Sequence, residues 1–114
     1  WGRIINISST NALNTYYPMG LEYDASKAAL ISLTHNLAIQ FAPFITVNAI
    51  APGFIETDMT NAVKAEIRDE WVKSIPLKRG GKPEDVASLV AFLVSNNAAY
   101  ITGQIICVDG GMGI

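Results

Sequence analysis

Tyr23 and Lys27 place a phenol and an ammonium four residues apart within residues 22–30 (EYDASKAAL). On a helix, residues i and i+4 lie on the same face, so both polar groups can reach one place. A nearby ammonium stabilises a phenolate by opposite charge, which makes the phenol a better general acid. This pair could therefore deliver a proton to a carbonyl oxygen that is being reduced. The same spacing also occurs by chance in many helices, with Tyr23 as a partly buried helix-start residue and Lys27 reaching into solvent.

Ser9 is the third residue that could take part in this chemistry. It follows residues 3–8 (RIINIS), a short β-branched run that ends in small polar residues and favours a buried parallel strand. At the end of that strand, the Ser9 hydroxyl could donate a second hydrogen bond to the same carbonyl oxygen. Residues 9–20 have the composition of a loop and carry aromatic and Met side chains able to wall a pocket.

Two helices and two further strands must position these residues. Residues 23–41 lack Gly and Pro and predict a helix with a wide buried face, whereas residues 83–94 begin with Pro-Glu-Asp and predict a second, strongly apolar helix. Between them, residues 56–74 are more polar and predict a mobile helical excursion anchored by Trp71. The other predicted strands are residues 45–50, which Pro52 and Gly53 close, and residues 104–108, which the turn 109–111 (DGG) follows.

The alternation of strands and helices predicts an α/β fold, in which a parallel sheet is covered on both faces and joined by right-handed crossovers. Ligands of such sheets bind at the carboxyl ends of the strands. Residues 8–10 and residues 52–57 follow the first two strands and are therefore the candidate site segments.

Composition excludes several classes of function. The net charge is −2 and the 8 Lys and Arg residues are scattered, which argues against a nucleic-acid partner. No apolar run approaches the roughly 20 residues that cross a bilayer, so we expect no membrane partner and a cytoplasmic location. The single Cys107, expected to be a buried strand residue, excludes an internal disulfide or thiolate-rich metal site. We expect no metal site, because no Cys or acidic residue lies at metal-ligand spacing from His35. A surface or interface role is expected for His35. Packing roles are expected for Met19, Met59 and Met112.

Three segments resemble consecutive signatures of the short-chain dehydrogenase/reductase family, in the same order: residues 6–9 (NISS), 23–28 (YDASKA) and 47–59 (VNAIAPGFIETDM). Residues 100–104 and 108–111 are similar to the carboxyl end of that family, and residues 51–59 most resemble its bacterial 3-oxoacyl-[acyl-carrier-protein] reductases. The resemblance implies a Rossmann-like doubly wound parallel sheet. Residues 1–114 would form its carboxyl-terminal part, three strands with flanking helices, and the amino-terminal dinucleotide-binding part would be absent.

The resemblance also implies roles for individual residues. Tyr23 matches the catalytic Tyr, and Lys27 matches the Lys that tunes it and binds the nicotinamide ribose. Ser9 matches the Ser that orients the substrate carbonyl, with Ser8 as the alternative.

Four further residues match the cofactor-binding pattern of the family. Pro52 and Gly53 match the turn that packs beside the nicotinamide. Ile55 matches the residue whose backbone meets the carboxamide, and Thr57 matches a residue that contacts the phosphates. An ordinary strand-ending turn and a plain helix cap remain the alternatives for Pro52-Gly53 and for Thr57.

The implied function is reduction of a 3-oxoacyl-[acyl-carrier-protein] thioester to the 3-hydroxyacyl form in fatty acid synthesis. NADPH is the expected cofactor, with NADH as the alternative, and a homo-oligomer, a tetramer by resemblance, is the expected assembly. The Gly-rich phosphate loop and the catalytic Asn of the family would lie upstream, so residues 1–114 alone are expected to be inactive. Two alternatives remain, namely the same chemistry on another alcohol or ketone, and a non-catalytic half-domain whose apolar helices serve association.

Overall fold

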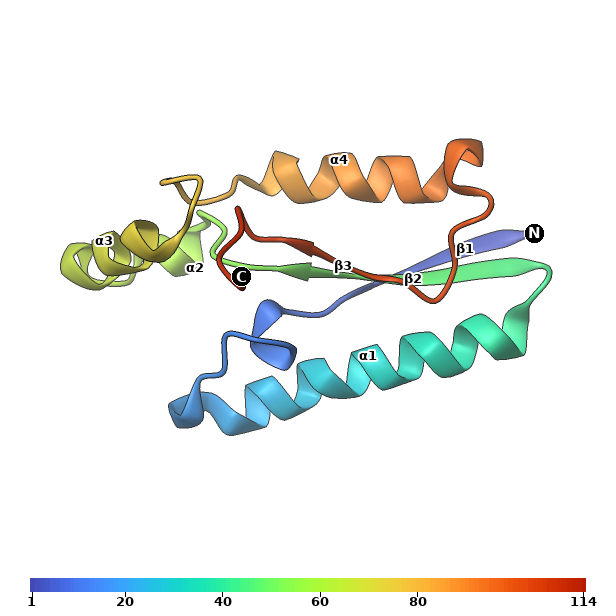
Figure 1. Ribbon diagram of the computed structural model, residues 1–114, viewed down its shortest axis with the longest axis horizontal. Coiled ribbons are helices and arrows are strands. Elements are labelled where there is room, and N and C mark those ends of the chain that lie inside the picture. The colour runs from blue at the N-terminus through green and yellow to red at the C-terminus, as the bar shows by residue number, and fades with distance from the viewer.

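A computed structural model describes residues 1–114 as a three-layer α/β arrangement, with a parallel sheet between helices (Figure 1). The strands β1 (Gly2–Ile7), β2 (Ile45–Pro52) and β3 (Ile105–Val108) all run parallel in the order β1-β2-β3. Helix α1 (Leu21–Phe41) covers one face of the sheet and helix α4 (Pro83–Val94) covers the other (Figure 1). The predicted fold class is thereby confirmed.

The central strand β2 forms the core of the sheet because it is paired on both edges. Ile7 of β1 pairs with Ile50, and Pro52 pairs with Val108 of β3. The side chain of Ile50 is fully buried and packs with Leu93 of α4, also fully buried. This register brings the carboxyl ends of β1 and β2 to the same side of the molecule (Figure 1).

Helix α1 is longer and less buried than predicted. It begins at Leu21 and buries only Thr34 and Ala38, whereas Ile39 is 81% exposed. The predicted wide buried face is therefore wrong, because a helix packed across a narrow sheet contacts the strands along one stripe. Helix α4 has the predicted bounds, and the carboxylate of Asp85 closes its start by accepting the backbone N–H of Lys82 at 2.8 Å.

The predicted polar excursion consists of two helices, α2 (Asp58–Asn61) and α3 (Ala65–Ser74), at the carboxyl-terminal end of the strands (Figure 1). The expected anchor, Trp71, meets Phe54 edge-on, with ring centroids 5.4 Å apart and an interplanar angle of 66°. Phe54 is buried, so this contact ties α3 to the segment that leaves β2.

Three single-residue expectations are wrong. Cys107 is exposed, because it lies on the outer strand β3 and faces away from Ile106, which packs against the α4 side. Met19 and Met59 are both 83% exposed and are not packing residues.

None of the helices combines the length and hydropathy that crossing a bilayer requires.

Candidate active site

A cavity of about 960 Å³ lies at the carboxyl ends of β1 and β2. Its wall comes from the end of β1, the following loop, the start of α1 and the segment that leaves β2. Every residue assigned a site role in the sequence lines this one cavity: Ser9, Tyr23, Lys27, Pro52, Gly53, Ile55 and Thr57. Lys27 is the only charged residue among those that line it, so the cavity presents positive charge.

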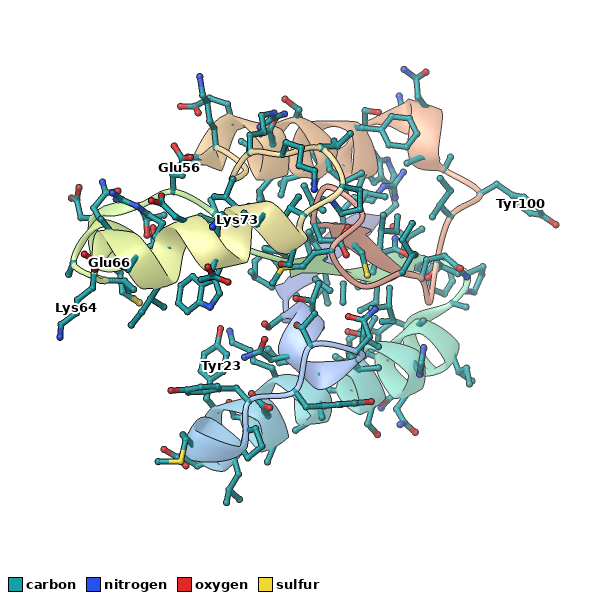
Figure 2. The ribbon with its side chains drawn as sticks, turned by 60° about the vertical axis from the view of Figure 1, so that its left-hand side comes forward. Tyr23, Glu56, Lys64, Glu66, Lys73 and Tyr100 are labelled. Carbon is teal, nitrogen blue, oxygen red and sulfur yellow. The ribbon has the colours of Figure 1, made fainter.

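Tyr23 stands near the start of α1 and its side chain extends toward the part of the molecule that carries α3 (Figure 2). The residue is 48% exposed. Its hydroxyl makes no hydrogen bond within the chain, so the phenolic proton is available to a molecule in the cavity.

The ammonium of Lys27 is held between two groups. Its Nζ donates to the carbonyl oxygen of Ile7 at 3.1 Å, and it lies 5.6 Å from the centroid of the Tyr23 ring, within the range of a cation–π contact. An ammonium has three donors and only one is used here, so two remain for other acceptors.

Ser8 and Ser9 both line the cavity but differ in what their hydroxyls do. Ser8 is 3% exposed and its Oγ donates to the carbonyl oxygen of Lys27 at 2.7 Å. Ser9 Oγ instead accepts the backbone N–H of Asn11 at 3.1 Å and makes no donation within the chain. The hydroxyl proton of Ser9 is therefore the one available for a carbonyl oxygen.

The turn at Pro52 and Gly53 is pressed against the end of β3. The N–H of Gly53 donates to the carbonyl oxygen of Val108 at 3.0 Å. A Cβ atom at position 53 would lie 2.7 Å from the Cβ of Asp109, which is closer than real Cβ contacts allow. Position 53 therefore requires Gly, and the turn beside the cavity depends on the turn that follows β3.

Ile55 forms an isolated parallel bridge with Gly81. The two hydrogen bonds of the bridge belong to its neighbours: the N–H of Gly81 donates to the carbonyl oxygen of Phe54 at 2.9 Å, and the N–H of Glu56 donates to that of Gly81 at 2.8 Å. In extended backbone, the polar groups of consecutive residues point to opposite sides, so those of Ile55 point away from Gly81. Its carbonyl oxygen accepts from Thr60 Oγ1 at 2.9 Å, whereas its N–H has no partner within the chain.

Thr57 acts as a helix cap in this structure. Its side chain accepts the backbone N–H of Thr60 at 3.4 Å, and its own N–H donates to Thr60 Oγ1 at 2.7 Å, which forms a reciprocal capping box at the start of α2. Its hydroxyl proton makes no hydrogen bond within the chain and remains free for an acceptor in the cavity.

Several wall residues were given no site role from the sequence, although residues 9–20 were expected to wall a pocket. They are apolar or aromatic and surround the mouth of the cavity: Tyr16, Tyr17, Met59, Val63, Trp71 and Met112. Their aromatic and Met content was the only signal in the sequence.

Two carboxylates fix parts of this wall. Asp24 accepts the backbone N–H of Tyr17 at 2.8 Å and so ties the loop to α1. Asp109 accepts the N–H groups of Gly111 at 2.9 Å and Gly113 at 3.3 Å, which folds the carboxyl-terminal turn so that Met112 reaches the cavity.

Comparison with known proteins agrees with this geometry. Residues 1–113 match the family described as enoyl-(acyl carrier protein) reductase. The chain is 50% identical over 113 residues to a 3-oxoacyl-[acyl-carrier-protein] reductase of Aquifex aeolicus, and the match covers 98% of this chain and 45% of that protein. A 3-oxoacyl-[acyl-carrier-protein] reductase of Rickettsia prowazekii is 53% identical, with 98% of this chain and 46% of that protein covered. The chain thus spans a little under half the length of these curated relatives.

Solved structures show the same likeness. A 3-oxoacyl-[acyl-carrier protein] reductase of Brucella melitensis superposes with a TM-score of 0.93 at 39% identity, over 98% of this chain and 42% of that one. An aldohexose dehydrogenase of Thermoplasma acidophilum superposes with a TM-score of 0.87 at 37% identity, over 96% of this chain and 47% of that one. A match over nearly the whole chain, together with this fold, shows that the chain belongs to the short-chain dehydrogenase/reductase family.

Proposed function

We propose that the protein carrying this chain reduces a 3-oxoacyl-[acyl-carrier-protein] to the 3-hydroxyacyl form with NADPH, in fatty acid synthesis. One observation carries the proposal: Tyr23, Ser9 and Lys27 line one cavity. The hydroxyls of Tyr23 and Ser9 donate no hydrogen bond within the chain, and the ammonium of Lys27 is held by the carbonyl oxygen of Ile7. These are the groups that reduction of a keto group needs around the oxygen, namely a proton donor, a hydrogen-bond donor and a positive charge.

The chain's own residues would act on the substrate oxygen as follows. Ser9 and Tyr23 donate hydrogen bonds to the keto oxygen and orient it. As negative charge develops on that oxygen, Tyr23 transfers its phenolic proton to it, so the alcohol O–H forms while the phenol O–H breaks. The ammonium of Lys27 stabilises the phenolate that is left.

The residues fit a nicotinamide cofactor, which when bound would supply hydride to the keto carbon. The free N–H of Ile55 suits a carboxamide oxygen, and the two unused donors of Lys27 suit the ribose hydroxyls. Pro52 and Gly53 would line the nicotinamide side of the cavity, and Thr57 would reach the phosphates through its hydroxyl proton.

The apolar mouth supports an acyl substrate. Tyr16, Tyr17, Met59 and Trp71 provide a wall suited to hydrocarbon, and the relatives named above are reductases of acyl-carrier-protein thioesters. We further propose that these residues are the carboxyl-terminal part of one Rossmann-like domain, and that the protein acts in the cytoplasm as a homo-tetramer. The likeness to an aldohexose dehydrogenase favours one second candidate, the same chemistry on another alcohol or ketone.

The proposal is tested with the full-length protein that carries this sequence. Oxidation of NADPH and of NADH is followed by absorbance with acetoacetyl-[acyl-carrier-protein], a small ketone and an aldohexose as alternative substrates. We expect the carrier-protein thioester with NADPH to give the highest kcat/KM. Preference for the ketone or the sugar would replace this function with the second candidate, and no turnover of any substrate in a folded protein would refute both.

A further inference from the structure

We propose that Arg79 and Asp85 are positioning residues for the cofactor, because they hold the segment 79–82, here called the strap, against the backbone of Ile55. The inference rests on the proposed function for the identity of the ligand. It adds two residues that lie outside the wall of this cavity.

The two ends of the strap meet at one carboxylate. The Nη1 of Arg79 donates to Asp85 Oδ2 at 2.9 Å and to the carbonyl oxygen of Gly80 at 2.9 Å. The same Oδ2 accepts the backbone N–H of Lys82 at 2.8 Å. The side chain of Asp85 therefore closes the strap at the start of α4. The residue before the strap, Lys78, has a φ of 56°, a left-handed backbone that a non-Gly residue adopts only when neighbouring contacts hold it.

The closed strap lies directly against the segment that leaves β2. A Cβ atom at Gly81 would lie 2.6 Å from Ile55 Cδ1, and one at Gly80 would lie 2.8 Å from the Cγ of Glu56. Two backbone hydrogen bonds cross the same contact, from Gly81 to Phe54 at 2.9 Å and from Glu56 to Gly81 at 2.8 Å. Figure 2 shows Glu56 beside the start of α4, where the strap ends. A displacement of the strap therefore displaces Ile55.

The direction of the free Ile55 N–H follows from this contact. The carbonyl oxygen of Phe54 and the N–H of Glu56 both form hydrogen bonds with Gly81. The N–H and carbonyl groups of Ile55 therefore point away from the strap, toward Thr60 and the cavity that Ile55 and Thr60 both line. The hydrogen bond from Arg79 and that from Lys82 N–H hold the pKa of Asp85 below its ordinary value, so the carboxylate is charged at neutral pH.

The ion pair is a positioning device rather than a source of stability. The side chains of Arg79 and Asp85 are 53% and 37% exposed, and such surface pairs add little to the free energy of unfolding. Breaking the pair would loosen the strap and misalign a single hydrogen bond to the cofactor. A misaligned hydrogen bond corresponds to about a tenfold loss of affinity.

The test uses three strap variants of the full-length protein. Asp85→Asn keeps an acceptor for the Lys82 N–H but removes the charge that Arg79 requires, Arg79→Ala removes the donor, and Arg79→Lys restores the charge. Glu70→Gln is the control, because it breaks another exposed ion pair, Lys73 to Glu70 at 3.3 Å, on α3. The readouts are KM and Kd for the nicotinamide cofactor, kcat, the melting temperature and hydrogen exchange of the Ile55 and Glu56 amides.

We expect Asp85→Asn and Arg79→Ala to raise the cofactor KM and Kd about tenfold, with kcat within about twofold of the wild type. Arg79→Lys should recover part of the affinity, Glu70→Gln should change nothing, and the Glu56 amide should exchange faster in the first two variants. Equal cofactor affinity in wild type and variants would overturn the inference alone. A parallel fall of kcat and melting temperature without a change in KM would also overturn it, because it would indicate a structural role. A folded wild type that binds no nicotinamide cofactor would overturn the proposed function as well.

Discussion

Lys27 and Ile7 are joined by a hydrogen bond of 3.1 Å from Nζ to the backbone carbonyl oxygen, so the ammonium beside Tyr23 also docks α1 onto the end of β1. A second bond runs the other way, from Ser8 Oγ to the carbonyl oxygen of Lys27 at 2.7 Å. A substitution of Lys27 would therefore change both the charge beside Tyr23 and the packing of α1 on β1. The cleaner tests of the chemistry are at Tyr23 and Ser9.

Tyr23→Phe in the full-length protein should lower kcat by about 10²- to 10⁴-fold, the contribution of a general acid. The melting temperature should be unchanged, because the lost hydroxyl has no hydrogen bond within the chain and the residue is 48% exposed. Rate and circular dichroism are measured on the same samples. Tyr100→Phe is the matched control, since Tyr100 is fully exposed and projects away from the site (Figure 2). Undiminished activity of the Tyr23 variant would contradict the assignment.

Ser9→Ala should lower the rate, whereas Ser8→Ala should lower the stability. Ser9→Ala should lower kcat by about 10²-fold through loss of a donor to the substrate oxygen. Ser8→Ala removes a buried donor to Lys27 and should cost about 1 to 3 kcal/mol in the free energy of unfolding. Urea titrations and steady-state rates of both variants check this. If Ser8→Ala lost the larger share of kcat while its stability was unchanged, the two roles would have to be exchanged.

Asn48→Asp should destabilise the protein by at least about 2 kcal/mol, because it leaves a buried acceptor facing a carbonyl oxygen. Asn48 is fully buried, its Nδ2 donates to the carbonyl oxygen of Ile101 at 3.0 Å, and its Oδ1 accepts the N–H of Gln104 at 3.0 Å. Chemical denaturation measures the change. Asn36→Asp on the exposed face of α1 makes the same chemical change without burial and should stay near the wild type.

Cys107 should be a slow nucleophile despite its exposure. Partial desolvation, and then the negative charge of Asp109, raise the pKa of its thiol above the ordinary 9.0. A raised pKa leaves less thiolate at any given pH, so iodoacetamide should alkylate Cys107 more slowly than glutathione at pH 8. The rate should still be climbing with pH at pH 9. A plateau below that pH would show that the local environment instead stabilises the thiolate.

The sequence was most informative where local chemistry decides the structure. Pro83 with the acids that follow it places the start of α4, and Gly110 and Gly111 have φ values of 64° and 86°, as a tight turn after a strand requires. The candidate site residues share one cavity because parallel strands bring their carboxyl ends together, and this follows from the alternation of strands and helices.

The features that could not be predicted depend on contacts between distant segments. The free N–H of Ile55 arises only because Gly81 pairs with its neighbours, and neither residue type indicates that pairing. The exposure of Cys107 depends on β3 being the outer strand of the sheet, and strand order is not encoded in periodicity. The two hydrogen bonds of the buried Asn48 side chain could not be predicted for the same reason, since its partners are more than fifty positions further along the chain.

The turn that Asp109 folds has a practical consequence for protein engineering. Because Met112 belongs to the cavity wall, a purification tag attached close to that residue would lie beside the site. Such a fusion could obstruct a bulky carrier-bound thioester while a small soluble ketone still entered, and it would imitate a change of specificity. Binding and rate measurements on this protein should therefore use material with the tag cleaved or placed elsewhere.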